Sequence, residues 1–326
     1  MTVAATEESF VPATADQPGT PPSPFFSVVI PTYRRLGLLP DALRSLATQT
    51  MRDFEVLVVD DDPAQSAKEL VEGFTELSVR YLPNDNARGG SGARNTGAFA
   101  ATGEWVAFLD DDDIWLPHKL AAVKTLITES ADPQLALVYS GHEKYDFERR
   151  AVISTYEPKV RGQALKQLLY KNYVGGMSVA VVRRDLLVRL GGLDARFLAL
   201  QDMELYVRLA QNGAIDFVDD SLVRIRSSSR ERITLDPEKK LQGARLFAEK
   251  YDDLITADPK LHHRAASRVL TFAVAARRYD IAFGALFWTL AGLVVDPANI
   301  SYVARAVARQ LVNRTPRAPR LRPSER

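Results

Sequence analysis

The chain contains no cysteine among its 326 residues. This absence excludes a disulfide-stabilised scaffold, a zinc site built on thiolates and a cysteine nucleophile. Histidine is scarce as well, with only four residues. Any bound metal ion would therefore be held by oxygen ligands or by one of these few imidazoles.

Long hydrophobic runs are also missing. The most apolar stretch covers residues 281–295, between Asp280 and Asp296. A membrane-spanning helix needs about 20 residues, so this stretch is too short to span a bilayer. Three interpretations stay open for it: a buried helix, a helix lying in a membrane interface, and a contact within an oligomer. No N-terminal signal segment is recognisable, and we expect a cytoplasmic protein.

Charge of one sign does not dominate the composition, since 42 basic and 41 acidic residues leave a net charge of +1. Its distribution is uneven, however. Residues 1–26 carry three acidic groups and no basic one, and residues 301–326 carry seven arginines and one glutamate. We expect a disordered leader over 1–26 and a basic disordered tail over 314–326.

Two interpretations of the arginine tail stay open. It could attract anionic lipid, which would place the protein peripherally at the cytoplasmic face of a membrane, or it could remain solvated. Nucleic acid is not an expected partner, because the tail has no interleaved aromatic residues.

Short apolar runs alternate with segments of helical periodicity between these ends. Four runs without polar alternation predict buried strands at 27–30, 54–60, 78–82 and 105–110. Helical segments are expected at 36–49, 64–76, 92–102 and 116–129. The repeat of strand and helix predicts an α/β fold with a mostly parallel sheet and helices on both faces.

Further strands, at an edge or in mixed orientation, are expected at 135–140, 177–182, 215–220 and 222–226. From Pro237 onward the pattern is helical, with segments at 238–256, 260–277, 279–294 and 297–312. The sequence therefore predicts an α/β domain over 27–235 and an all-helical C-terminal extension over 236–313.

Acidic clusters follow two of the predicted strands, at residues 60–62 and 110–113. Ligands of open parallel sheets bind at the carboxyl ends of the strands. Seven carboxylates there would repel one another unless a cation lies among them, and oxygen ligands favour Mg²⁺ or Mn²⁺. The competing interpretation is that aspartates cap the following helices near Pro63 and Pro117, but capping needs one aspartate per helix.

Four segments in this order resemble the family 2 glycosyltransferases of the GT-A fold: SVVIPTYRR, FEVLVVDDDP, ARNTGAFAATGEWVAFLDDDDIWLPHKL and GGLDARFLALQDMELYVRLAQNG. The resemblance covers about 200 residues, from Ser27 to Arg226. It implies a Rossmann-like sheet and an inverting, metal-dependent transferase that uses a nucleotide-diphosphate sugar.

The resemblance also implies roles for residues on the donor side. Pro31, Thr32 and Tyr33 match the loop against the base and ribose. Asp61 matches the carboxylate that accepts a hydrogen bond from the uracil ring nitrogen, and Arg94 matches a basic residue near the diphosphate. Arg94 could instead be a surface arginine on a helix.

Asp110 and Asp112 fit the D-x-D pattern of the family's metal site, with Mn²⁺ or Mg²⁺ as the cofactor. Because four aspartates stand in a row, Asp111 with Asp112 is a second alignment. Asp112 belongs to both and is the firmest metal ligand; Asp110 and Asp111 also count as donor-binding residues.

Asp202 matches the catalytic base of the family. The base usually follows a glutamate, whereas Gln201 precedes it here. Its alternative role is that of an N-cap for the following helix, and Glu204 is the reserve candidate. The implied reaction is an in-line displacement in which Asp202 takes the proton of the acceptor hydroxyl.

The expected function is transfer of a sugar, from a UDP-sugar in the first place, to a hydroxyl of a glycan or lipid-linked acceptor, as in cell-surface polysaccharide or glycoconjugate synthesis. A non-catalytic nucleotide-sugar or glycan-binding module on the same fold is one alternative. A nucleotidyltransferase is another, although PTYRRLG (31–37) does not resemble its phosphate loop.

Overall fold

The structure is a computed structural model that describes residues 23–87, 89–227, 236–295 and 304. Most of the predicted leader, the predicted helix 297–312 apart from Ala304, and the arginine tail lie outside these residues.

A nine-stranded sheet forms the centre of the fold, with the strand order β3-β2-β1-β4-β8-β6-β9-β5 and with β7 paired to β6. The strands are β1 (Phe26–Thr32), β2 (Phe54–Asp60), β3 (Arg80–Pro83), β4 (Trp105–Phe108), β5 (Ile114–Trp115), β6 (Leu135–Asp146), β7 (Ala151–Tyr156), β8 (Ala180–Arg183) and β9 (Ala214–Arg226). The pairs β2–β3, β1–β2, β1–β4 and β6–β9 are parallel, and β8 joins β4 to β6 in antiparallel orientation. The predicted α/β class is confirmed: the first four strands are parallel, and the sheet is mixed beyond them.

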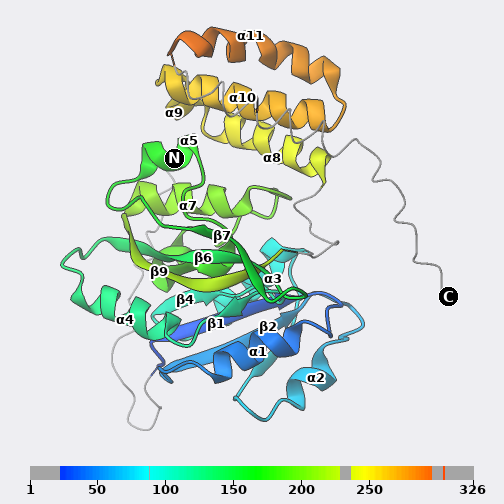
Figure 1. Ribbon diagram of the computed structural model, residues 1–326, viewed down its shortest axis with the longest axis vertical. Helices are drawn as coiled ribbons and strands as arrows, with labels where there is room; N and C mark the ends of the chain where they lie inside the picture. Colours follow the sequence, from blue (N-terminus) through cyan, green and yellow to red (C-terminus); the bar gives the residue numbers. More distant parts are fainter. Residues whose placement is uncertain (1–22, 88, 228–235, 296–303, 305–326) are drawn as a thin grey trace, which may run out of the picture.

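Helices cover both faces of this sheet (Figure 1). They are α1 (Leu39–Ala47), α2 (Lys68–Glu72), α3 (Gly90–Ala100), α4 (Lys119–Glu129), α5 (Leu165–Tyr170), α6 (Arg184–Arg189) and α7 (Gln201–Asn212). Strands β1, β2 and β4 are apolar almost throughout because they are buried on both faces.

Several predicted elements differ from the observed ones. The expected strand 177–182 begins with a 3₁₀ turn, Met177–Val179, before β8, and the two strands expected at 215–226 are one strand with register shifts against β6. The helix expected at 64–76 is reduced to the single turn and a half of α2.

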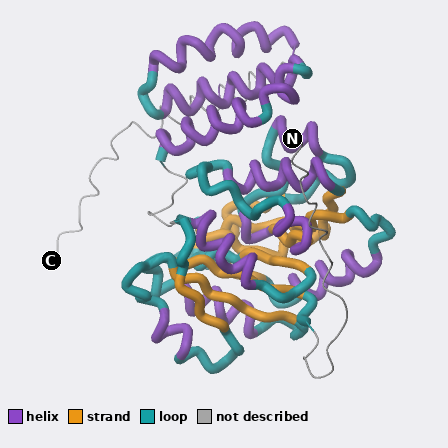
Figure 2. Tube along the Cα trace, turned by 180° about the vertical axis from the view of Figure 1, so that it is seen from behind, coloured by secondary structure: helices purple, strands orange, loops and turns teal. Residues whose placement is uncertain are grey.

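Four further helices stack at one end of the molecule, beyond α5 and α7 (Figures 1 and 2). They are α8 (Pro237–Lys250), α9 (Asp252–Thr256), α10 (Pro259–Ala275) and α11 (Tyr279–Val295). Helix 238–256 is thus divided at Tyr251. Phe247 and Tyr251 belong to the main core, so α8 is packed onto the α/β part.

Two buried arginines of α10 strengthen this packing. Arg264 Nε donates to the Tyr170 carbonyl, and Arg268 Nη2 donates to the Leu169 and Tyr170 carbonyls at the end of α5. Among the described residues, no helix combines the length and apolarity required to cross a bilayer.

Candidate active site

The carboxyl ends of β1, β2 and β4 meet at one edge of the sheet. The Asp61 backbone N–H after β2 donates to the Thr32 carbonyl at the end of β1 (2.8 Å). The Thr32 hydroxyl in turn donates to Asp111 Oδ2 after β4 (2.8 Å). The three sequence motifs at 31–33, 60–62 and 110–113 therefore lie side by side, as the parallel arrangement predicted.

The buried Asp61 carboxylate is held on both oxygens. Its Oδ1 accepts from the Asn84 side-chain amide (2.6 Å), and its Oδ2 accepts from the Gly89 backbone N–H (2.8 Å). Gly89 has φ +99°, a conformation that favours glycine. Each carboxylate oxygen has a second lone pair, so Asp61 is an oriented acceptor. Tyr33, which follows Thr32 in the first of the three motifs, is half exposed.

The other two aspartates of the 60–62 cluster shape the loop after β2. Asp60 accepts hydrogen bonds from the N–H groups of Asp62 and Ala67 (both 2.9 Å). Asp62 pairs with Arg34 (3.0 Å), whose hydrogen bond lowers the pKa of Asp62 to about 2. The interpretation that an aspartate side chain caps the next helix is wrong, because α2 begins at Lys68, six residues after Asp62, and has no side-chain cap.

The four aspartates after β4 point to different partners. Arg94 on α3 pairs with Asp110, and Arg35 lies between Asp111 (3.0 Å) and Asp112 (3.2 Å). These guanidinium groups offset the mutual repulsion of the carboxylates. Here too the helix-capping interpretation is wrong, since α4 has no side-chain cap.

Asp113 points inward from the same turn. It accepts from the Ser178 hydroxyl (2.7 Å) and from the Arg226 backbone N–H (3.1 Å). Burial, together with the charges of Asp110 and Asp112, raises the pKa of Asp113 well above its ordinary value. Ser178 also accepts the Asp110 N–H (3.0 Å) and so anchors both ends of the acidic turn.

Asp110, Asp112 and Asp113 can bring one oxygen each within 4.8 Å of one another. This donor set consists only of carboxylate oxygens, which suits Mg²⁺ or Mn²⁺. Asp111 is turned away toward Thr32 and Arg35, and burial raises its pKa to about 6. The geometry therefore favours the Asp110–Asp112 alignment over the Asp111–Asp112 one.

Arg94 is not a surface residue, since only 7% of it is exposed. Helix α3 lies very close to the sheet at Gly97, where an added Cβ would come within 2.3 Å of Val29 Cγ1. This close packing carries Arg94, one turn earlier, to the carboxyl edge of the strands. Its Nη2 binds Asp110, and its buried Nε has no hydrogen-bond partner among the described residues.

Asp202 occupies the second position of α7, after Leu200, which is the N-cap and has φ +64°. The alternative interpretation of Asp202 as the N-cap is therefore wrong. Its Oδ1 accepts from the Met203 N–H (2.7 Å), and its Oδ2 accepts from the Asn172 side-chain amide (3.2 Å). Burial raises the pKa of Asp202 to about 6, while the Met203 N–H and the nearby Arg94 oppose this shift.

The reserve candidate Glu204 faces the opposite direction. It is fully buried and forms ion pairs with Arg208 and Lys250 (both 2.7 Å) and a hydrogen bond with Tyr251 (3.1 Å). These contacts fasten α7 to α8. Of the two acidic residues in this turn, only Asp202 is near Arg94 and Asp110.

Sequence reasoning assigned no role to several residues that build this site: Arg35, Asn84, Asn172 and Ser178. Arg35 belongs to a recognised motif, and Arg226, within the arginine-rich segment 224–230, donates through Nε to the Asp112 carbonyl (3.2 Å). The other three are isolated polar residues far along the chain from their partners, so no local pattern identified them.

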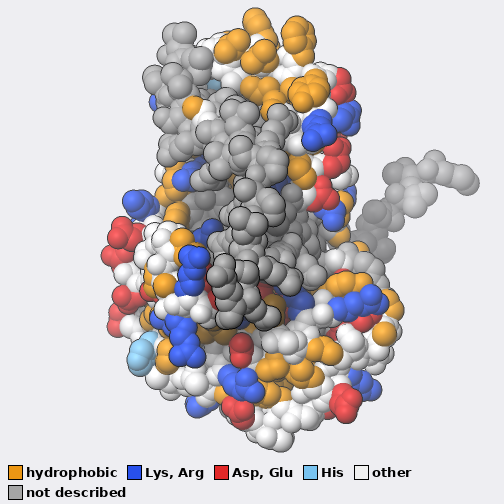
Figure 3. Space-filling model, turned by 45° about the vertical axis from the view of Figure 1, so that its right-hand side comes forward, with side chains coloured by type: hydrophobic (Ala, Val, Ile, Leu, Met, Phe, Trp, Pro, Cys, Tyr) orange, Lys and Arg blue, Asp and Glu red, His pale blue; other side chains and the backbone are white. Residues whose placement is uncertain are grey.

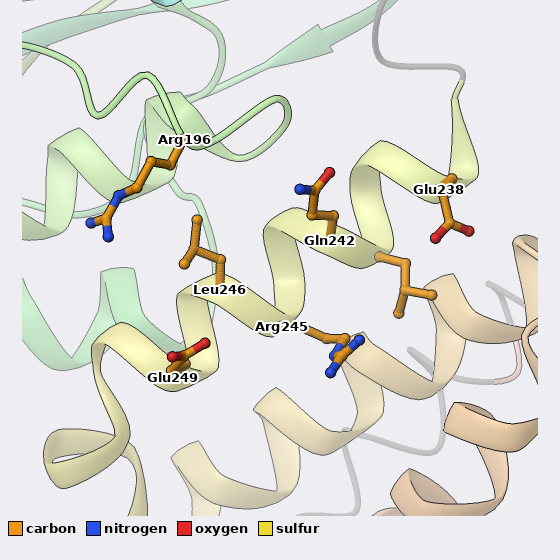
Figure 4. Close-up of a pocket in the computed structure, with 7 residues that line it drawn as sticks. Arg196, Glu238, Gln242, Arg245, Leu246 and Glu249 are labelled. Atoms are coloured by element: carbon orange, nitrogen blue, oxygen red, sulfur yellow. The ribbon is translucent and has the colours of Figure 1, made fainter.

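A cavity of about 570 Å³ lies elsewhere, on α8 beside Arg196 (Figure 4). Its lining includes Glu238, Gln242, Arg245 and Glu249. None of the aspartates described above lines it. Its charged lining residues are two arginines and two glutamates.

The sequence matches the family "Glycosyl transferase family 2" over residues 27–191. An Escherichia coli protein named UDP-Glc:alpha-D-GlcNAc-diphosphoundecaprenol beta-1,3-glucosyltransferase WfgD is 32% identical over 117 residues, which are 36% of this chain and 45% of that protein. The chain covers between 35% and 62% of the length of the first three curated relatives.

Two solved structures share the fold. S. aureus TarS 1-349 in complex with UDP-GlcNAc has a TM-score of 0.57 at 21% identity, over 88% of this chain and 80% of that one. The mannosyltransferase PcManGT from Pyrobaculum calidifontis, in complex with GDP-Man and Mn²⁺, has a TM-score of 0.52 at 22% identity, over 90% and 88%. The GT-A-like fold expected from the sequence is thereby confirmed, and since the family match covers half of the chain, this protein belongs to glycosyl transferase family 2.

Proposed function

We propose that this enzyme transfers a sugar from a nucleotide-diphosphate donor, in the first place a UDP-sugar, to a hydroxyl group of a glycan or lipid-linked acceptor, with inversion at the anomeric carbon. One observation carries the proposal. The buried guanidinium of Arg94 binds Asp110 and lies near enough to Asp202 to lower its pKa, so the diphosphate side and the base side of the reaction share one centre.

The donor would bind along the edge formed by β1 and β2. Asp61 offers an oriented acceptor to a base that presents a ring N–H, which both uracil and guanine do. Pro31, Thr32 and Tyr33 would lie against base and ribose. The names of the E. coli relative and of the TarS complex favour uracil, whereas the PcManGT complex contains GDP-Man.

The diphosphate would lie beside Arg94, whose buried Nε has no hydrogen-bond partner in the described part of the chain and is a donor that an anionic oxygen can satisfy. Asp110 and Asp112 would hold Mg²⁺ or Mn²⁺, and Asp113 lies close to them. Asp111 would stabilise the turn through the hydrogen bond that it accepts from Thr32. A divalent cation held there supplies Lewis-acid stabilisation of the charge on the leaving diphosphate.

Asp202 would act as the general base toward the acceptor hydroxyl. Burial has raised its pKa toward neutrality without protonating it at pH 7, which is the property required of a general base. Asn172 holds one carboxylate oxygen and the Met203 N–H holds the other, so the orientation of the base is set before the acceptor arrives. The diphosphoundecaprenol in the name of the E. coli relative favours a lipid-linked acceptor.

A donor screen tests this function. The purified protein is incubated with each common nucleotide sugar and Mn²⁺, Mg²⁺ or a chelator, and released nucleoside diphosphate is measured. We expect release from a UDP-sugar that depends on the divalent ion. Asp112→Ala should reduce it at least about 100-fold, whereas Asp219→Ala, a matched change of an exposed carboxylate on β9, should leave it unchanged.

Full activity in the chelator, or in the Asp112→Ala variant, would overturn the metal assignment. Nucleotide-sugar binding with no transfer to any hydroxyl acceptor would instead favour the non-catalytic binding module. Pyrophosphate release from a nucleoside triphosphate would indicate a nucleotidyltransferase.

A further inference from the structure

Helix α11 presents its large apolar side chains to solvent. Tyr279, Phe283, Phe287 and Leu290 are 60%, 80%, 68% and 55% exposed, and Leu286 and Trp288 are exposed as well. The spacing of these positions along the helix places most of them on one face. Figure 3 shows hydrophobic side chains gathered at this end of the molecule.

The inner face of α11 carries mostly small residues. Ala282 and Thr289 are buried, and Ala285 and the larger Ile281 pack against the same cluster as Ala282. A helix on the surface of a globular protein normally buries its large apolar residues and exposes its charged ones. In α11 most of the large apolar residues are exposed instead. The only charged residue in Tyr279–Val295 is Asp280. Contiguous exposed apolar surface of this kind marks an interaction site.

Charge indicates which partner covers this face. Arg277 and Arg278 precede the helix, and residues 301–326, which follow it, carry seven arginines and one glutamate. A second copy of the chain would bring the same Arg277 and Arg278 to the contact, whereas anionic lipid headgroups complement these arginines. Tyrosine and tryptophan next to phenylalanine and leucine suit the boundary between headgroups and acyl chains.

We propose that the exposed face of α11 (Tyr279, Phe283, Leu286, Phe287 and Leu290) docks in the interface of an anionic membrane. The helix lies in the plane of the interface and does not span it, in agreement with its length. Membrane binding by this face is independent of catalysis, so it can be tested apart from the proposed transferase function.

The tryptophans provide a reporter within the chain. Of the three, Trp105 and Trp115 are each 1% exposed in the core, and Trp288 on α11 is 46% exposed. Fluorescence changes on addition of vesicles therefore report on α11. The full chain is mixed with vesicles of phosphatidylcholine and phosphatidylglycerol, or of phosphatidylcholine alone, and binding is also measured by sedimentation.

We expect binding to the anionic vesicles, a blue shift of the emission and quenching by lipids brominated in the acyl chain. The double variant Phe283→Ser/Phe287→Ser should weaken binding at least tenfold, and removal of residues 314–326 should weaken it on anionic vesicles. The matched control Ile153→Ser, which changes a 53% exposed apolar residue on β7, should bind as the unaltered chain does.

Each other outcome overturns the proposal. Absence of vesicle binding by the unaltered chain, or undiminished binding by the double variant, excludes membrane docking by this face. A dimer that dissociates in the double variant, without vesicle binding, assigns the face to a second copy. A monomer with no vesicle binding and a buried Trp288 assigns it to the chain's own C-terminal segment. Because Asp202→Asn should bind vesicles normally, failure of the transferase proposal would leave this result intact.

Discussion

The variant Asp202→Asn tests both the proposed base and the physical reason for its pKa. The substitution keeps the shape of the side chain, and the amide oxygen can still accept the Met203 N–H. It removes the negative charge and the capacity to take a proton. We expect transfer to fall by about 10² to 10⁴-fold, the range for loss of a general base, with donor affinity retained.

The pKa of Asp202 sets the size of two further effects. With a pKa of about 6, about 90% of the carboxylate is ionised at pH 7 and about 10% at pH 5, so the rate should fall roughly tenfold per pH unit below pH 6. A divalent cation on the neighbouring aspartates would move this fall in rate to lower pH, because positive charge favours the ionised form of Asp202.

Burial of the charge also affects stability. The folded-state pKa lies above the ordinary value of 3.8, so the folded protein binds the proton more tightly and loses stability as the pH rises from about 4 to 6. The two pKa values differ by about 2, which sets an upper limit of about 3 kcal/mol at pH 7. Because Asp202 keeps partial contact with water, the gain in Asp202→Asn should be smaller, about 1–2 kcal/mol.

The assay combines a pH–rate profile under saturating donor with urea unfolding of both proteins at pH 5 and pH 7. Asn172→Ala serves as the companion variant, because it removes a hydrogen bond to Oδ2 without removing the base. It should lower kcat about tenfold and move the acid limb to higher pH, since the ionised form loses a donor. An active Asp202→Asn protein, or one that is less stable than the unaltered chain at pH 7, would refute the reasoning.

Two other predictions concern the interior of the fold. Lys119 is fully buried without a carboxylate ion pair in the described part of the chain, and burial lowers its pKa to about 7. The free energy of unfolding should therefore rise by up to about 1.4 kcal/mol per pH unit above pH 7. In urea unfolding, Lys119→Met should flatten this pH dependence, whereas the surface control Lys68→Met should keep it. Equal slopes in Lys119→Met and the unaltered chain would contradict this account. Gly92→Ala would place its Cβ 1.5 Å from the Ala87 carbonyl oxygen and should destabilise the protein by at least about 2 kcal/mol. Gly284→Ala on α11, whose Cβ would meet no atom within 4 Å, should stabilise the protein by up to about 1 kcal/mol. Thermal unfolding of the two variants tests this difference, and equal midpoints would contradict it.

Local sequence patterns determined the secondary structure where apolar periodicity was strong. The strands β1, β2 and β4 were predicted almost to their ends, because burial on both faces requires continuous apolar runs. Prediction failed at 64–76, where a helix of 13 residues was expected and α2 has five. There Asp60 binds the Ala67 N–H across the loop, a contact that no periodicity reveals.

The sequence by itself also determined the edge of the sheet where the chemistry gathers. Parallel strands place their carboxyl ends together, so the motifs at 31–33, 60–62 and 110–113 had to lie side by side. Only the tertiary structure showed which contacts each aspartate makes. Asp60 and Asp62 form hydrogen bonds and an ion pair within the loop after β2, and Asp111 accepts a hydrogen bond from Thr32. The carboxylate oxygens of Asp110 and Asp112 lie close enough together to hold one metal ion.

The approach of distant residues was likewise decided by packing. Gly97 allows α3 to lie close to the sheet and brings Arg94 to the site, and Asn172 reaches Asp202 from 30 positions away. Such contacts depend on how helices pack against the sheet, which hydrophobic periodicity alone does not encode. The same is true of α11: its composition identified an apolar helix, but only its packing on α10, with Ala282 and Thr289 buried, showed that most of its large side chains point outward.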